Sequence, residues 1–414
     1  MRGVIWLVLL FAVAVVAATT LGSNDGIVSI YWSGWRSDLS LNLFLLLLIG
    51  TCVLLVLAAQ AVNALLTLPQ RASEWRALRR ERVAQSALRE ALAEYFSARY
   101  SRAHKAARRA LALQQEAGEL KDDAQFTVLG HLLAAGSLHR LQDRGRRDAL
   151  MQNLLRGLRK GGGHGADDGA RLLAAEWALD DRDAARAAEL LAALPAGVAR
   201  RTQALRLKLQ AARMNRQPLE ALHTARMLAN HQAFTPAAAQ GLLRSLAGEA
   251  IDDTHDHQQL RRLWEQFDAS DRRDPFVAAR AAVRAVKLDA IDEAREWLRP
   301  FWDRWGELDR DGREQIALAT VTASPGIGSD WLPRLEAAVQ SHGHEPAVML
   351  AVGIAFADRQ LWGKARKMLE QAAASPGLPN PGRRQAWRAL AQLARDESDD
   401  ARAQQCERAA AALD

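Results

Sequence analysis

The chain has 414 residues, an apolar fraction of 49% and a formal net charge of +7. Its only cysteines are Cys52 and Cys406, which excludes a disulfide framework, a Cys-x-x-Cys zinc site and a covalent haem-attachment motif. A glycine-rich stretch at residues 161–165 lacks the Lys-Ser/Thr pair of a phosphate-binding loop. Because no nucleophile stands beside a base either, we expect no catalytic residues and no resident flavin or metal.

Two long uncharged apolar segments lie near the N-terminus, at residues 4–21 and 39–62. A helix needs roughly 20 apolar residues to cross a bilayer. We therefore predict a two-span membrane anchor over residues 1–66, with a short external loop between the spans. In an alternative interpretation the first segment is a cleaved signal peptide, with Arg2 before it and small residues at Ala17 and Ala18. Cleavage would leave the second span in the same orientation.

Basic residues are concentrated after the second span. The external loop carries only Arg36, whereas residues 64–115 contain eleven Lys/Arg and four acids. Because Lys and Arg stay on the cytoplasmic side of a span, both termini are predicted to be cytoplasmic. We assign residues 67–115 to a basic juxtamembrane helix and a first helical hairpin. Its basic side chains are expected to face anionic lipid, at about 1 kcal/mol each close to the surface, rather than nucleic acid. They are Arg71, Arg76, Arg79, Arg80 and Arg82.

Residues 116–414 are rich in the helix formers Ala, Leu, Arg, Glu and Gln. Proline and glycine punctuate them at hairpin spacing, which predicts an all-α chain ending in a tetratricopeptide-like solenoid. The clearest unit is residues 346–376, where the small residues Gly353 and Ala365 let two helices approach closely. Equivalent alanines repeat at roughly the ~34-residue tetratricopeptide period or twice it, giving about nine hairpins with irregular ones near 260–267 and 331–339. They are Ala103, Ala149, Ala184, Ala221, Ala294, Ala365 and Ala403.

Aromatic and histidine groups are the remaining candidate sites. Inter-helix packing is the ordinary explanation for the cluster Trp297, Phe301, Trp302 and Trp305, although a solenoid's concave surface also uses such residues to anchor partners. Two histidine pairs have the chemistry to ligate haem iron or a metal. Each pair lies at a predicted hairpin junction, where polar residues are expected in any case. They are His255 with His257, and His342 with His344.

The order of these features resembles the HemY family of proteobacterial inner-membrane proteins linked to protohaem biosynthesis. The resemblance rests on two spans around a Gly-Ile-Val-Ser-Ile segment at 26–30, the basic helix 76–82, and the motifs Ala-Leu-Ala-Glu at 91–94 and Leu-Arg-Arg-Leu-Trp at 260–264. It implies a tetratricopeptide scaffold in the bacterial inner membrane, acting near late haem-biosynthesis enzymes, with haem at most a transient ligand. An unrelated flavin-dependent oxidase shares the name, and this chain lacks its dinucleotide fingerprint.

Two other functions stay open at this point. One is an adaptor for envelope assembly, although the zinc-ribbon cysteines of one such adaptor family are absent. The other is a protein that handles haem weakly through its exposed histidines.

Overall fold

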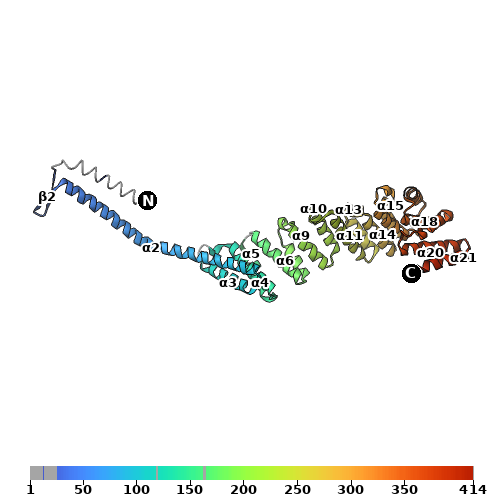
Figure 1. Cartoon of the computed structure of the whole chain (residues 1–414), viewed down its shortest axis with the longest axis horizontal. Helices are drawn as coiled ribbons and strands as arrows, with labels where there is room; N and C mark the ends of the chain where they lie inside the picture. Colours follow the sequence, from blue (N-terminus) through green and yellow to red (C-terminus); the bar gives the residue numbers. More distant parts are fainter. Residues whose placement is uncertain (1–12, 14–25, 118–119, 162–164, 414) are drawn as a thin grey trace. The chain divides into compact units, whose positions relative to one another are not determined.

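The structure is a computed structural model that describes residues 13, 26–117, 120–161 and 165–413. Apart from residue 13, the first predicted span, at residues 4–21, lies outside these ranges. The chain divides into an N-terminal unit, Met1–Leu154, and a C-terminal unit, Leu155–Asp414 (Figure 1). Within the described ranges all regular structure is helical except one β-hairpin, which confirms the all-α prediction.

The β-hairpin opens the described part of the N-terminal unit. Strand β1, Ile27–Trp32, pairs antiparallel with β2, Trp35–Ser40. Ser33 and Gly34 join them with φ of 44° and 87°, the positive values that a two-residue hairpin turn requires. The weak alternation of residues 27–32 indicates a short extended segment in the external loop, and strand β1 confirms it. The second strand was missed because its sequence, WRSDLS, does not read as a strand.

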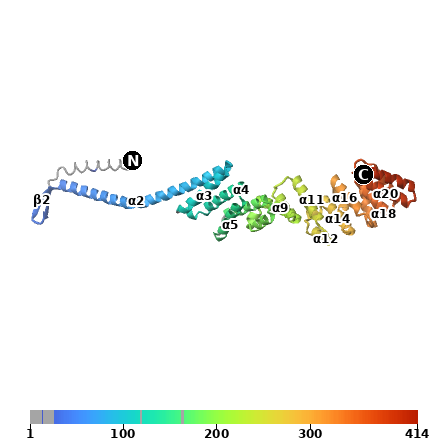
Figure 2. The same cartoon turned by 90° about the horizontal axis from the view of Figure 1, so that it is seen from below.

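Helix α2, Leu41–Phe96, is 56 residues long. Ser40 caps its N-terminus, and the Ser40 side chain accepts a hydrogen bond from the Leu43 N–H at 3.4 Å. The helix therefore begins at Leu41, two residues after the predicted start of the apolar segment. The helix does not end at residue 66, and even Pro69 lies within it. It runs through the basic segment into the first hairpin (Figure 2), because strong helix formers on both sides of Pro69 outweigh the cost of that single proline.

The second half of α2 forms a hairpin with α3, Tyr100–Glu116. Buried alanines line both helices, among them Ala87 and Ala110. Helix α4, Ala124–Arg140, approaches α3 so closely that a Cβ on Gly130 would lie 2.7 Å from Leu111 Cδ2. The other elements here are η1, Leu120–Asp122, and α5, Arg144–Gly161.

The described residues of the C-terminal unit form seven consecutive helix pairs with short additional helices. The pairs are α6 Gly165–Asp180 with α7 Ala184–Ala192, α9 Thr202–Met214 with α10 Pro218–Asn230, α11 Pro236–Asp252 with α12 His257–Gln266, α14 Pro275–Lys287 with α15 Ile291–Asp303, α16 Arg310–Thr322 with α17 Leu332–His342, α18 Pro346–Asp358 with α19 Trp362–Ala374, and α20 Asn380–Asp396 with α21 Asp400–Ala411. Six of these pairs are helical hairpins, whereas α17 packs mainly on α18 and α15 rather than on α16. The short helices are α8 Ala196–Ala199, α13 Ala269–Arg272, η2 Trp305–Glu307 and η3 Ser329–Trp331. The two irregular units predicted near 260–267 and 331–339 correspond to α11–α12 and α16–α17.

One turn recurs inside the regular hairpins. Its central residue has positive φ, and the next N–H donates to the carbonyl five residues earlier, as Leu361 N does to Phe356 O at 2.8 Å. This bond satisfies an orphan carbonyl at the end of the first helix. The turn residues inside hairpins are Ala98, Gln142, Arg182, Arg216, Asp289, Gln360 and Ser398.

The turn corrects the predicted register at two positions. The fifth residue after the turn is a buried alanine in six hairpins: Ala103, Ala187, Ala221, Ala294, Ala365 and Ala403. The predicted Ala184 is therefore replaced by Ala187, three residues later. In the α4–α5 hairpin the equivalent residue is Arg147, which is 4% exposed, whereas the predicted Ala149 is exposed. Alanine is so common here that its spacing alone did not determine the phase.

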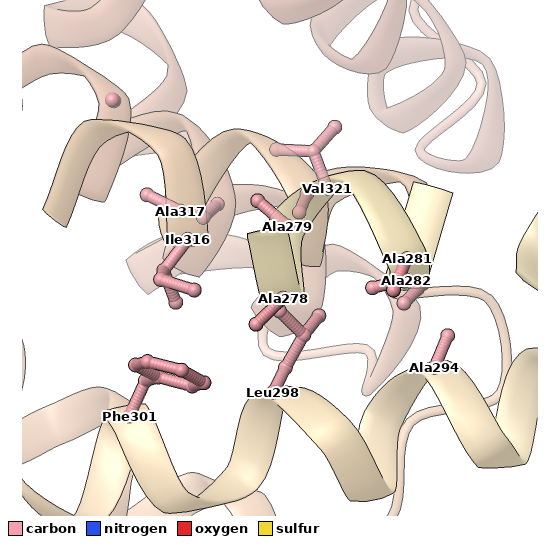
Figure 3. Packing of buried hydrophobic residues seen from close by; sticks show 14 of the residues in the cluster. Ala278, Ala279, Ala281, Ala282, Ala294, Leu298, Phe301, Ile316, Ala317 and Val321 are labelled. Atoms are coloured by element: carbon pink, nitrogen blue, oxygen red, sulfur yellow. The ribbon is translucent and has the colours of Figure 1, made fainter. Parts of the chain in front are cut away.

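Small residues allow close packing within and between hairpins, as predicted for Gly353. A Cβ on Gly353 would lie 2.8 Å from Leu369 Cγ across the α18–α19 contact. Figure 3 shows the same kind of packing two units earlier, where Ala278 of α14 faces Leu298 of α15 and Ala282 lies on the side of Ala294. Ile316 of α16 closes this core from the next hairpin.

Candidate functional site

The aromatic cluster proposed as a partner anchor is part of the core, which corrects that hypothesis. Trp297, Phe301, Trp302 and Trp305 are between 2% and 9% exposed. Trp302 and Trp305 stack with ring centroids 4.2 Å apart, and Trp302 Nε1 donates to Thr320 Oγ1 at 2.9 Å. These side chains fill the space between α15 and its neighbours and present no surface to a partner.

The histidine pairs lie at hairpin junctions, as expected. His255 and His257 are exposed beside the start of α12. The rings of His342 and His344 are 6.3 Å apart, and His342 Nδ1 contacts Ser341 Oγ at 2.8 Å. Among the described residues, no three His, Cys, Asp or Glu side chains are grouped so that they could hold a metal ion. A metal ion bound at either pair would therefore have no third protein ligand among these described residues.

A cavity of about 480 Å³ opens where the regular hairpin packing is interrupted. Helix α7 has only nine residues, and the short helix α8 follows it before α9 begins. Both α7 and α10 pack on α9, and the cavity lies among these three helices and α8. Its floor is apolar and includes Leu191, Leu194 and Leu205, with Met227 at the rim.

The rim of this cavity carries charge. Arg200 is exposed at the end of α8. Lys208 Nζ lies 3.3 Å from the carboxylate of Glu220, and both side chains are more than 40% exposed, so this ion pair contributes little to stability. A basic surface in this region could have been predicted from the sequence, because residues 196–219 contain six Lys/Arg and no acid.

A second cavity of about 480 Å³ adjoins the first, and both are lined by Gln217 and Glu220. It extends to the α11–α12 hairpin, where Leu263 and the polar residues Gln259 and Arg262 line it. We call the two cavities together the α7–α12 groove. An apolar pocket that continues into a more polar one suits an extended peptide with an apolar anchor side chain. Among the residues that the structure describes, no histidine lines either cavity.

The second feature with functional meaning is the apolar half of α2. The stretch Leu41–Val62 has 22 residues, and none of its most apolar window is buried. A core helix of a soluble protein would be covered by its neighbours. By length and composition this stretch is able to cross a bilayer. Among the described residues no other helix meets that test.

The geometry of α2 restricts the predicted contact between basic side chains and lipid. At about 1.5 Å per residue, Arg71 lies roughly 14 Å beyond Val62 and Arg82 roughly 30 Å beyond it. The headgroup layer and one Debye length together reach about 15 Å. Arg71 is therefore the one within reach if the helix stands upright, while Arg79, Arg80 and Arg82 are exposed farther along. The structure describes no side chain for Arg71 or Arg76.

A comparison with known protein families finds a match for the N-terminal part of the chain. The description "HemY protein N-terminus" matches residues 26–121. Residues 26–121 are therefore similar to the N-terminal domain of the HemY family. That domain covers the β-hairpin, the whole of α2 and α3. It therefore joins the exposed apolar helix to the first helical hairpin.

The other comparisons add less. A search of curated proteins finds no significant match. Among solved structures, a chain from the crystal structure of the APC/C hetero-tetramer Cut9–Hcn1 is similar to this one at 14% identity. The TM-score is 0.28, and the match covers 84% of this chain and 68% of that one.

Proposed function

We propose that this HemY-domain protein is a membrane-tethered, tetratricopeptide-like scaffold at the cytoplasmic face of the bacterial inner membrane. The observation that carries the proposal is the continuity of α2: one helix contains an exposed 22-residue apolar stretch and also forms half of the first hairpin. Such a helix holds a protein-binding domain at a membrane surface. Tethering raises the effective concentration of partners that share the membrane.

The orientation in this proposal follows from charge. One basic residue, Arg36, lies before the apolar stretch in the loop, whereas eleven follow between residues 64 and 115. With the first apolar segment as a second span, both termini are cytoplasmic. Reporter fusions at Asp25 and Asp414 test this and are expected to report opposite compartments. A periplasmic signal at Asp414 would contradict the orientation and remove any cytosolic partner.

The partners in this proposal are enzymes of late haem biosynthesis, and the protein itself performs no catalytic step. The HemY domain supports the connection with haem. The α7–α12 groove supports a protein partner, because its apolar floor and polar continuation fit a peptide segment. Repeated hairpins bind partners on such extended surfaces without supplying chemistry.

Photo-crosslinking from the two exposed methionines tests the partner and the groove together. Met227 and Met214 are each 38% exposed, but only Met227 lines the groove. A photoreactive residue is placed at either position in the full chain in native membranes. We expect haem-biosynthesis enzymes to crosslink from position 227 and not from 214.

The other outcomes of this experiment are equally informative. Envelope-assembly proteins captured at position 227 would favour the adaptor alternative over a role in haem biosynthesis. Equal crosslinking from both positions would show that the groove is not the partner site.

A further inference from the structure

The β-hairpin has two chemically different faces. The register pairs Val28 with Leu39, Ile30 with Ser37 and Trp32 with Trp35, and directly paired residues point to the same side of a sheet. One side is therefore apolar except for Ser37. We call it the apolar face, and it consists of Val28, Ile30, Trp32, Trp35, Ser37 and Leu39.

The opposite side of the hairpin is polar apart from Ile27 at its base, which is 69% exposed. Ser29 Oγ and Arg36 Nε both donate to Asp38 Oδ1, the latter at 3.0 Å, and Arg36 lies over the Tyr31 ring at 5.7 Å. The hydrogen bonds from Ser29 and then Arg36 lower the pKa of Asp38. The charged groups of this network are hydrated, so burying this side of the hairpin in lipid would be energetically unfavourable.

The apolar face has no cover in the part of the chain that the structure describes. Trp32 is 79% and Trp35 82% exposed, and Ile30 is 41% exposed. Only the base residues Val28 and Leu39 are half-buried, near the start of α2. A two-stranded hairpin is marginally stable in water by itself, so this face requires a partner surface.

The attachment of the hairpin identifies that surface. Leu41 N, the first residue of the apolar stretch, donates to Gly26 O at 2.9 Å, which holds the base of the hairpin at the end of the helix. In Figures 1 and 2 the hairpin projects across the axis of α2 rather than along it. A hairpin that crosses the axis of a spanning helix at its end lies along the membrane plane.

We propose that the hairpin lies flat on the periplasmic surface of the bilayer, with its apolar face in the headgroup region and its polar face toward water. Tryptophan is the residue type that prefers this layer. Standing upright, a six-residue hairpin would carry Trp32 and Trp35 about 20 Å into water. Lying flat, it forms an interfacial anchor that fixes how far α2 inserts. This inference rests on the proposed spanning role of Leu41–Val62.

Nitroxide accessibility in the full-length protein tests the inference. Single cysteines are introduced in a Cys52→Ser/Cys406→Ser background, and the protein is reconstituted in phosphatidylethanolamine–phosphatidylglycerol vesicles. Ile30→Cys and Trp32→Cys probe the apolar face, and Tyr31→Cys probes the polar face. We expect labels on the apolar face to be relaxed severalfold more by oxygen than by a water-soluble nickel chelate, and the reverse at position 31.

A control label in the apolar stretch separates this inference from the proposal beneath it. With Val53→Cys relaxed by oxygen alone, nickel access at positions 30, 31 and 32 together would overturn the flat hairpin and leave the span intact. Shielding of positions 30 and 32 from both reagents would indicate a protein cover and also overturn it. Nickel access at Val53→Cys would overturn the span itself.

A second measurement needs no spin label in the hairpin. Brominated lipids quench tryptophan fluorescence at the level of their bromine atoms. We expect the Trp32→Phe/Trp35→Phe variant to lose a measurable part of the quenching seen in the wild-type chain. Unchanged quenching would contradict the flat hairpin, because these two rings are its deepest probes.

Discussion

Replacing Gly353 with alanine tests whether the α18–α19 contact depends on a missing Cβ. The added carbon would lie 2.8 Å from Leu369 Cγ, 2.9 Å from Leu369 Cδ2 and 3.3 Å from the Leu369 backbone nitrogen. Ordinary carbon contacts are about 3.5–4.0 Å, and Leu369 is fully buried. Its branch point therefore has to move by several tenths of an ångström or more into a filled core.

The free-energy change of this variant combines two opposing effects. Overpacking of a filled core typically costs about 1–3 kcal/mol, whereas alanine in a helix interior is better than glycine by about 1 kcal/mol. The net change is a destabilisation of about 0–2 kcal/mol. Gly241 in α11 provides the matched control, because a Cβ there meets nothing within 4 Å. Gly241→Ala keeps only the helix term and is expected to stabilise by about 1 kcal/mol.

Thermal melting of the full chain in detergent, followed by helical circular dichroism, measures the difference. The two variants differ by about 1–3 kcal/mol in this estimate. A cooperative unit of 150–250 residues shifts by about 2–4 °C per kcal/mol. We expect Gly353→Ala to melt below Gly241→Ala by several degrees. If Gly353→Ala raises Tm as much as the control does, the close approach of α18 and α19 is wrong.

Three further predictions concern an ion pair, a thiol and haem. Arg313→Ala removes the cation from an ion pair whose side chains are 13% and 11% exposed, so urea unfolding should show a loss of about 3 kcal/mol. Arg186→Ala, whose intrahelical pair with Glu189 is 48% and 69% exposed, should lose less than about 1 kcal/mol, and equal losses would refute this. Burial raises the pKa of the Cys406 thiol, so less thiolate is present at a given pH. Iodoacetamide should therefore react with Cys406 slowly until denaturant is added, and equal rates with and without denaturant would show that the thiol is accessible in the folded chain. Titrated haemin should bind weakly and reversibly, and a sharp Soret band that His255→Ala/His257→Ala abolishes would instead support the haem-handling alternative.

Features of the recurrent hairpins could be predicted from the sequence where they depend on residues that are close together in the chain. The role of Gly353 could be predicted from the sequence because it depends only on the contact between two helices that follow each other in the chain. The phase of the alanine repeat failed in the α4–α5 hairpin, where Arg147 takes the buried position. Its Nε lies 2.8 Å from Asp148 Oδ1 and its Nη1 lies 2.8 Å from His139 Nδ1. Those contacts replace the close packing that alanine provides elsewhere, and residue spacing does not encode them.

The candidate sites show the same division. The tryptophans around Trp302 were correctly suspected of packing, but their burial depends on which helices cover them, and composition does not say so. The α7–α12 groove was not predicted. A cavity forms where several separate helices leave space between them, and the sequence does not show how those helices are arranged. The sequence feature that relates to it is the stretch 196–219, which contains six Lys/Arg and no acid.

By itself, the sequence determined the properties that depend on neighbouring residues: the helical content, the 22-residue apolar stretch of α2 and the charge difference across it. Helix propensity, hydropathy and charge are each summed over a short window, so they need no knowledge of the fold. The tertiary structure alone decided which side chains are covered. It buried Trp302 and Arg147, opened the α7–α12 groove and left Trp32 and Trp35 exposed. Burial is decided by elements that meet only after folding, and these surfaces are where binding occurs.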